Sequence, residues 1–305
     1  MKNSLIFWLI LWSALSLSQE RQIEVLILGI AQDGGYPQTM CQKACCQDVL
    51  NFKSTGKYVS SLAIIDRDSM HCWLIDCTPD VNKQLAMLTS YLDGGAFALQ
   101  GIFLSHAHIG HYLGLAQFGK EVMGVKELSV YAMPRMKTFL ESNGPWDQLV
   151  TLKNIKIIEM ENGVEIHLNN DIVIRPILVP HRDEYSETVG FELLGPRSKV
   201  LFIPDIDKWE KWDRTILDEV KRVDFALLDA TFYSGNELGR NMDSIPHPSV
   251  LESMKILEPL TSEQKSKVHF IHMNHSNPIL RQTTEREKVI SLGFNIARQG
   301  ASIDL

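Results

Sequence analysis

Three histidines, at positions 106, 108 and 111, fall within six residues, directly after the apolar run 101–104. In an extended backbone His106 and His108 project to the same side, and His111 follows at a spacing that suits the first turn of a helix. Neutral imidazole is the commonest protein ligand for zinc-like ions. The spacing therefore predicts a metal centre at the end of a buried strand. The alternative, three solvated loop histidines, is less favoured because the whole chain has only 10 histidines.

Apolar runs alternate with amphipathic segments along the chain, and no linker or internal repeat interrupts them. Helices are expected at 80–92, at 134–142, 209–220, 249–257 and 283–291, and from near His111. Strands are expected at 23–30, 61–65, 72–77, 101–105, 128–131, 155–159, 164–168, 172–179, 189–193, 200–203, 225–229, 268–272 and 294–297. This mixture predicts an α/β fold in one domain of residues 22–305.

The composition is that of an ordinary globular protein, with 305 residues, 45% of them hydrophobic and 22% charged. A surface that binds nucleic acid usually has a basic excess, whereas this chain has a formal net charge of −7. We therefore expect a small-molecule substrate and no nucleic acid. The sequence does not indicate an oligomeric state.

The N-terminus has the pattern of a secretory signal peptide over residues 1–18. Lys2 precedes the apolar run 5–17, and the small residues Ser16 and Ser18 precede a cleavage point before Gln19. The apolar run is too short to span a bilayer comfortably. The pattern predicts a periplasmic or secreted protein with no stable membrane insertion, and an uncleaved membrane anchor is the alternative.

The HAHIGH segment, followed by Gly114, resembles the first metal motif of the metallo-β-lactamase superfamily. The resemblance implies an αββα sandwich, in which two mixed β-sheets pack face to face with helices outside. His181, Asp205 and His272 each follow a strand-like run and match the remaining ligands of the family in order. The implied ligands of a first ion are His106, His108, His181 and Asp205, and those of a second are His111, His272 and Asp205.

The usual motif of that family is HxHxDH, and this chain has Gly110 at the position of the aspartate. The change removes one ligand of the second ion, so the sequence is compatible with one or two catalytic ions. Asp207 is a candidate to supply the lost carboxylate or to replace Asp205. Zinc is the expected metal for an imidazole-rich site, and manganese or iron are also allowed.

Asp229 in LLDATFYSGNE and His247 in IPHPSV resemble the acidic residue and the histidine of the phosphodiesterase branch, which includes tRNase Z. The resemblance implies that His247 protonates the leaving group and that Asp229 orients it. A carboxylate beside a histidine raises its pKa and fixes its ring, which suits a proton donor. Because the usual aspartate is missing, Asp205 would also help to accept the proton of the attacking water.

The chain as a whole resembles the pyrroloquinoline quinone biosynthesis protein B family, in GIAQDGGYPQ, HAHIGH, LLDATF and NHSNPIL. Related phosphodiesterases bind a structural zinc, and the resemblance implies that Cys41, Cys45, Cys46 and His275 form such a site. A disulfide among these thiols is the alternative in an oxidising compartment. Cys72 and Cys77 have no assigned role, and Cys77 is expected to pack in the core.

These features together predict a metal-dependent hydrolase that acts on a small ester or phosphodiester. One alternative is a role in making the quinone cofactor by oxidative chemistry at iron. The predicted export of the protein disfavours this role, because the precursor of that pathway is expected inside the cell. The other is a non-catalytic protein that keeps the fold after losing one metal, and Gly110 is the main feature in its favour.

Overall fold

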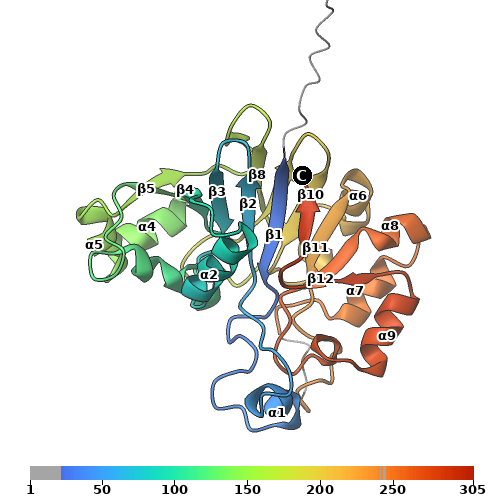
Figure 1. The fold of residues 1–305 in the computed structure, drawn as a ribbon. Coiled ribbons are helices and arrows are strands. Elements are labelled where there is room, and N and C mark those ends of the chain that lie inside the picture. The colour runs from blue at the N-terminus through green and yellow to red at the C-terminus, as the bar shows by residue number, and fades with distance from the viewer. Residues whose placement is uncertain (1–21, 241, 243–244) are drawn as a thin grey trace, which may run out of the picture.

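The computed structural model describes residues 22–240, 242 and 245–305, and it contains two seven-stranded sheets that face each other (Figure 1). The first sheet has the order β14 (Ser302–Asp304), β1 (Ile23–Gly29), β2 (Ser61–Asp66), β3 (His71–Ile75), β4 (Ala98–Phe103), β5 (Leu128–Ala132) and β6 (Ile155–Glu159). The second has the order β13 (Asn295–Ile296), β12 (Val268–Ile271), β11 (Phe225–Asp229), β10 (Lys199–Ile203), β9 (Val189–Leu194), β8 (Val173–Leu178) and β7 (Ile166–His167).

Both sheets are mixed, and each contains a parallel run of strands. β3, β4, β5 and β6 pair in parallel in the first sheet, and β10, β11, β12 and β13 do so in the second. Parallel strands bring their carboxyl ends to one edge of a sheet, where α/β proteins usually bind their ligands. The loops after β4, β10, β11 and β12 carry most of the predicted site residues, so the topology gathers them at this edge.

The core explains why the strands are apolar on both faces. In β1, Val25 and Ile27 belong to the hydrophobic cluster that includes both sheets, whereas Leu26 and Leu28 point into the cluster under the outer helices of the first sheet. Successive side chains of a strand point to opposite faces, so a strand buried on both sides needs a continuous apolar run. The two facing sheets with outer helices confirm the predicted sandwich.

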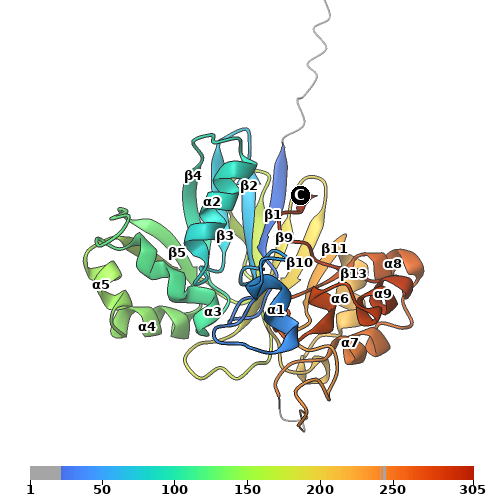
Figure 2. The same ribbon diagram turned by 60° about the horizontal axis from the view of Figure 1, so that its bottom comes forward.

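Helices cover the outer faces of the sheets, as Figures 1 and 2 show. Those beside the first sheet are α2 (Val81–Tyr91), α4 (Pro134–Ser142) and α5 (Trp146–Thr151). Those beside the second are α6 (Ile216–Arg222), α7 (Val250–Ile256), α8 (Ser262–Ser266) and α9 (Thr284–Ser291). The short α3 (Ile109–Tyr112) begins within the HAHIGH segment, and α1 (Ala44–Leu50) lies in the long loop after β1.

Most predicted elements agree with the structure to within a few residues, but the helix expected at 209–220 is wrong. A 3₁₀ turn, η2 (Trp209–Lys211), ends at Trp212, and α6 begins only after Thr215. The Thr215 hydroxyl accepts a hydrogen bond from the backbone N–H of Asp218, which caps the helix. The strand expected at 164–168 is also reduced, to the two residues of β7.

Two short 3₁₀ helices, η1 (Leu113–Phe118) and η3 (Pro278–Leu280), complete the described elements. Sequence patterns missed α1, α5, α8 and β14, which are all short. No helix in the described part of the chain is long and apolar enough to cross a bilayer. The predicted signal peptide, residues 1–18, lies outside the described residues and stays a prediction.

Candidate metal centre

The structure brings together the four predicted ligands of the first ion. His108 Nδ1 lies 2.8 Å from His106 Nε2 and 3.3 Å from His181 Nε2. The Asp205 carboxylate lies 3.3 Å from His106 Nε2 through one oxygen and 3.3 Å from His181 Nε2 through the other. Bonds of about 2.0–2.1 Å to a tetrahedral ion would separate the ligand atoms by about 3.3 Å. These four side chains therefore fit one metal ion.

The predicted ligands of the second ion also meet, and a carboxylate that the sequence patterns missed joins them. Asp205 Oδ2 lies 3.7 Å from His111 Nε2 and 3.9 Å from His272 Nε2. Asp33 Oδ1, from the loop after β1, lies 3.3 Å from the same His111 nitrogen and 3.9 Å from that of His272. We call the seven residues of both groups the metal centre: Asp33, His106, His108, His111, His181, Asp205 and His272.

The additional carboxylate near His111 comes from Asp33 and not from Asp207, the candidate that the sequence offered. The Asp207 carboxylate instead pairs with Lys211 at 2.6 Å, on the same short turn of chain. The candidate role of Asp207 in the metal centre is therefore wrong. Asp33 lies in the AQDGGYP segment, whose turn-forming residues predicted a loop but gave no indication that its carboxylate faces His111.

Hydrogen bonds fix which nitrogen of each ring faces the centre. The Ser105 hydroxyl donates to Asp76 at 2.9 Å, so it can only accept from the Nδ1–H of His106, 3.0 Å away. Asp76 also lies 2.6 Å from Nδ1 of His111 and accepts its proton. Both rings use Nδ1 for these hydrogen bonds, so Nε2 is the atom that would bind a metal.

His272 is held in the same way. The Thr231 hydroxyl donates to Asp229 at 2.7 Å and accepts from His272 Nδ1 at 3.0 Å, which leaves Nε2 free to act as a ligand. His272 also has a left-handed backbone, with φ of 61°, which costs energy in a residue other than glycine. Strain of this kind persists where the surrounding structure demands it, as at metal and active sites.

The close approach of two loops requires a glycine within the motif. A Cβ atom at Gly114 would lie 2.2 Å from the carbonyl oxygen of Thr78 and 2.9 Å from that of Cys77. Cys77 binds this segment through both backbone groups, donating to the His111 carbonyl at 2.8 Å and accepting from Gly114 at 2.9 Å. Cys77 is fully buried, as expected, and it fixes the backbone behind His111.

Burial and charge set the protonation of these rings. Burial lowers the pKa of His106 well below its usual value, and it lowers that of His181 to about 4 and that of His272 to a lesser extent. His111 differs, because the charges of Asp76 and Asp33 outweigh burial and raise its pKa well above the usual value. Three rings are thus neutral and ready to bind a cation, and a metal at His111 would displace a proton.

Several buried atoms of the centre lack any hydrogen-bond partner among the described residues. They are Asp33 Oδ1, His111 Nε2, His272 Nε2, Asp205 Oδ1 and His181 Nδ1. Unpartnered buried polar atoms are rare in folded proteins because each costs about 1–3 kcal/mol. Cations bound by the two ligand groups would satisfy the first four atoms, so the centre has the chemistry of a metal site.

Asp229 and His247 form a pair beside the centre. His247 Nδ1 lies 2.9 Å from Asp229 and 3.1 Å from Asp205. Protein donors already engage both Asp229 oxygens, through the Thr231 N–H and hydroxyl and the Ile206 N–H. Burial would lower the pKa of His247, but the charges of Asp229 and Asp205 outweigh it and raise the pKa to about 9.

His247 lines a cavity of about 330 Å³, together with Phe232, Ser234, Lys208 and Lys211. Its ring packs edge-on against Phe232, with the ring centres 6.0 Å apart. Since Nδ1 is held by the two carboxylates, Nε2 is the ring nitrogen left to exchange a proton with a bound molecule. The cavity is of the size that small-molecule ligands occupy.

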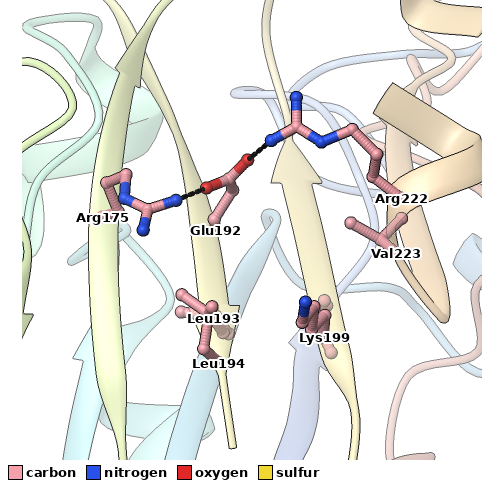
Figure 3. Close-up of a pocket in the computed structure, with 8 residues that line it drawn as sticks. Arg175, Glu192, Leu193, Leu194, Lys199, Arg222 and Val223 are labelled. Carbon is pink, nitrogen blue, oxygen red and sulfur yellow. Dashed lines mark hydrogen bonds and ion pairs between the residues drawn. The ribbon is translucent and has the colours of Figure 1, made fainter. Parts of the chain in front are cut away.

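A different cavity, between β8, β9 and β10, contains charged groups that pair with one another (Figure 3). There Glu192 binds Arg175 directly and lies 3.7 Å from Arg222. Arg214 also lies within 4.0 Å of Glu192. With its charge balanced by neighbouring guanidinium groups, this glutamate is a structural residue of the second sheet.

The predicted structural zinc ligands also lie together, and we call them the cysteine cluster: Cys41, Cys45, Cys46 and His275. The Cys45 sulfur lies 3.8 Å from that of Cys41 and 4.0 Å from that of Cys46, and His275 Nδ1 lies 3.4 Å from Cys46. A disulfide would bring two sulfurs to about 2.05 Å, whereas four ligands around zinc keep them about 3.8 Å apart. All five cysteines are free, so the arrangement fits zinc and not the disulfide.

Residues 71–273 match the beta-lactamase superfamily domain. The coenzyme PQQ synthesis protein B of Azotobacter vinelandii is 23% identical, over an alignment that covers 93% of this chain and 100% of that protein. The crystal structure of Zn²⁺-bound PqqB from Methylobacterium extorquens is similar, with a TM-score of 0.76 at 19% identity over 92% of this chain and 100% of that one. A diphosphatase from the PhnP family gives a TM-score of 0.66 at 18% identity, over 92% and 96%.

The domain match spans more than half of the chain and includes every residue of the metal centre except Asp33. The similar solved structures have the same fold over nearly the whole described chain. The similar proteins include PqqB and a PhnP-family protein, which are the kinds of protein that the sequence resembled. The chain belongs to the beta-lactamase superfamily.

Proposed function

We propose that this protein is a metal-dependent hydrolase that acts on a small ester or phosphodiester. One observation supports it above the others: five histidines and two carboxylates converge at the carboxyl edge of the sheets, and hydrogen bonds orient the rings of three of these histidines. Zinc is the expected metal, since the ligand set is rich in imidazole and a similar solved structure is described as Zn²⁺-bound. Manganese or iron would also fit the mixture of nitrogen and oxygen.

A bound divalent ion would lower the pKa of a water ligand and polarise the bond to be cleaved. Asp205 has its carboxylate at the junction of both ligand groups, where it can accept the proton of the attacking water. Burial opposes its ionisation, but the pKa of Asp205 is held well below the usual value among the surrounding histidines, of which the protonated His247 lies 3.1 Å away. Asp205 therefore stays ionised, as a metal ligand must be.

His247 is the proton donor in this proposal. Its raised pKa of about 9 keeps the ring protonated near neutral pH, and Asp229 fixes its orientation. Nδ1 is held by the two carboxylates, and the residue lines the cavity, so Nε2 is the nitrogen available to a bound molecule. A leaving oxygen bound in the cavity would take the proton from this nitrogen as the bond breaks.

The test is hydrolysis of bis-(p-nitrophenyl) phosphate and of p-nitrophenyl acetate by the zinc- or manganese-loaded protein. We expect turnover that falls by about 10³-fold or more in His106→Ala and by about 10²–10⁴-fold in His247→Ala. His167→Ala is the matched control, because that ring is exposed and pairs only with Glu165 among the described residues. Turnover that persists in His106→Ala would contradict the proposal.

A second candidate function comes from the relatives, which are named coenzyme PQQ synthesis proteins and align along nearly all of this chain. Under this candidate the centre would hold iron and use oxygen to modify a precursor of the quinone. Iron in the purified protein, with oxygen consumption and no ester hydrolysis, would favour it. Protein that holds no ion at the metal centre would instead favour a non-catalytic member of the fold.

We also propose that the protein acts outside the cytoplasm, on the basis of the signal-peptide pattern at 1–18. Cell fractionation of a C-terminally tagged protein tests this, with mass spectrometry of its N-terminus. Recovery in the periplasm or medium with Gln19 first is expected. Recovery in the membrane with an intact Met1 would point to the uncleaved anchor.

A further inference from the structure

Position 110 of this chain cannot hold a side chain while Asp33 is in place. A Cβ atom at Gly110 would lie 2.1 Å from Asp33 Oδ1 and 2.8 Å from the Asp33 Cα. The second contact involves the backbone, so a rotation of the Asp33 side chain would not remove the clash. An aspartate at position 110 and Asp33 therefore exclude each other, and the Asp33 carboxylate fills the space beside Gly110.

Backbone pairing fixes Asp33 in this position. Ala31 forms a parallel bridge with Met273, and the Gln32 N–H donates to the Met273 carbonyl at 2.9 Å. These bonds tie the loop after β1 to the residue that follows His272. The Gln32 side-chain amide then donates to Asp33 Oδ2 at 2.9 Å. One oxygen is thus engaged by Gln32, and the other, Oδ1, points toward His111 and His272.

Oδ1 of Asp33 is buried and has no hydrogen-bond partner in the described part of the chain, and the same is true of Nε2 in His111 and in His272. Three ligand atoms without partners, one of them on a carboxylate, surround the same point. An ion there would satisfy all three.

We propose that Asp33 is a ligand of a second metal ion, with His111, His272 and Asp205, and that it replaces the carboxylate which the family motif carries at position 110. Loss of the motif aspartate then does not mean loss of the second ion. The carboxylate is supplied by the loop after β1 instead of the loop after β4, and the absence of a side chain at Gly110 leaves room for it.

The two ion sites would differ in their ligand atoms. The first offers three imidazoles and one carboxylate, and the second offers two imidazoles and two carboxylates. Oxygen-rich sites suit harder ions such as Mn²⁺, whereas imidazole suits zinc. When zinc is limiting, we expect it to fill the first site and Mn²⁺ to compete best at the second.

Metal stoichiometry tests the proposal without relying on turnover. Metal-free protein is loaded with Zn²⁺ or Mn²⁺ and analysed by elemental mass spectrometry and calorimetry. Wild type should take two equivalents at the metal centre, beside one at the cysteine cluster. Asp33→Asn should lose one, with second-site affinity lower by about 100-fold or more, since even residues behind a ligand contribute 10–100-fold. The exposed Asp68→Asn is the matched control and should bind like wild type.

A second variant and a direct location of the ion complete the design. Asp33→Gly, which removes the carboxylate entirely, should also lose the second ion. Anomalous diffraction from zinc-soaked wild-type crystals should place an ion about 2.0–2.2 Å from Asp33 Oδ1, whether or not the variants fold. Full binding by Asp33→Asn, or a wild type with one ion at the metal centre, would overturn the inference.

The inference rests on the metal dependence in the proposed function but not on the reaction, so the two can fail separately. A wild type that hydrolyses esters with one ion at its metal centre would overturn the role of Asp33 and leave the hydrolase intact. A protein that binds both ions through Asp33 but cleaves no ester would do the reverse.

Discussion

The metal centre and the cysteine cluster collect their ligand atoms in different ways. The centre takes its residues from loops after several strands, spread along the chain from Asp33 to His272. The cysteine cluster takes three of its four residues from one short segment, 41–46, beside α1. The first can form only when both sheets are assembled, whereas the second needs one loop and His275.

The metal centre and the cysteine cluster also differ in the chemistry of their ligands. Three thiols and one imidazole would complete a closed tetrahedral zinc site with no position for substrate. The metal centre instead mixes nitrogen and oxygen, stands beside the proton donor His247, and adjoins a cavity of about 330 Å³. The cysteine cluster is therefore suited to stabilising a loop, whereas the metal centre is suited to binding a reactant.

Two short stretches of chain nevertheless connect the clusters. One runs from Asp33 through Tyr36 to Cys41, and the other runs from His272 to His275. The Tyr36 hydroxyl donates to the Cys45 carbonyl at 2.8 Å, which fixes the first stretch against α1. Because the second ion site uses both Asp33 and His272, the cysteine cluster supports that site more than the first.

The largest effect is expected from Asp205→Asn, which alters the residue shared by both ion sites. Loss of this charge should remove the ions of the metal centre and reduce turnover by about 10³-fold or more. Elemental analysis should still find one zinc equivalent, held by the cysteine cluster. Asp207→Asn is the control, since Asp207 pairs with Lys211 outside the centre. Loss of all zinc from Asp205→Asn would show that the two clusters are not independent.

The next effect is expected from Cys46→Ser, which removes a buried ligand of the cysteine cluster. We expect loss of one zinc equivalent, a Tm lower by about 5 °C, and faster proteolysis within the loop around α1. Because that loop carries Asp33, the second ion should also bind more weakly while the first is unaffected. Cys72→Ser is the control for a buried thiol away from the cluster. An unchanged affinity for the second ion would contradict the proposed support of that site by the cysteine cluster.

These two regions also show what the sequence can and cannot predict. The apolar strands and the HAHIGH spacing are local patterns, so the sandwich fold and the metal ligands at strand ends could be predicted. Asp33 could not, because its contact with Gly110 joins loops far apart in the chain. The prediction of a helix at 209–220 was wrong for a local reason. The helix begins after its cap at Thr215, although the apolar spacing also includes Trp209 and Trp212.

A smaller effect is expected from pH in the metal-free protein. His247 has a folded-state pKa of about 9, above the usual 6.5 of an unfolded histidine. Its contribution to the free energy of unfolding is therefore complete below about pH 6.5 and is lost as the pH rises through about 9. The shift corresponds to about 3 kcal/mol. Thermal unfolding at pH 6 and pH 9.5 measures it, and the pH dependence should shrink in His247→Gln. Equal pH dependence in both proteins would contradict the pairing with Asp229.

The smallest effect is expected from residues that hold the rings without binding an ion, and burial should decide its size. Asp76, fully buried, accepts from His111 Nδ1 at 2.6 Å, whereas Glu184, 45% exposed in its side chain, lies 3.0 Å from His108 Nε2. Asp76→Asn should weaken second-site metal binding by about 10–100-fold, since the amide cannot fix the ring in the same way. Glu184→Gln should weaken first-site binding only a few-fold, because the amide oxygen or water can accept from His108 Nε2 at this exposed position. If calorimetry finds the opposite order, burial does not determine how firmly each ring is held, and the difference between the two ion sites must come from their ligands alone.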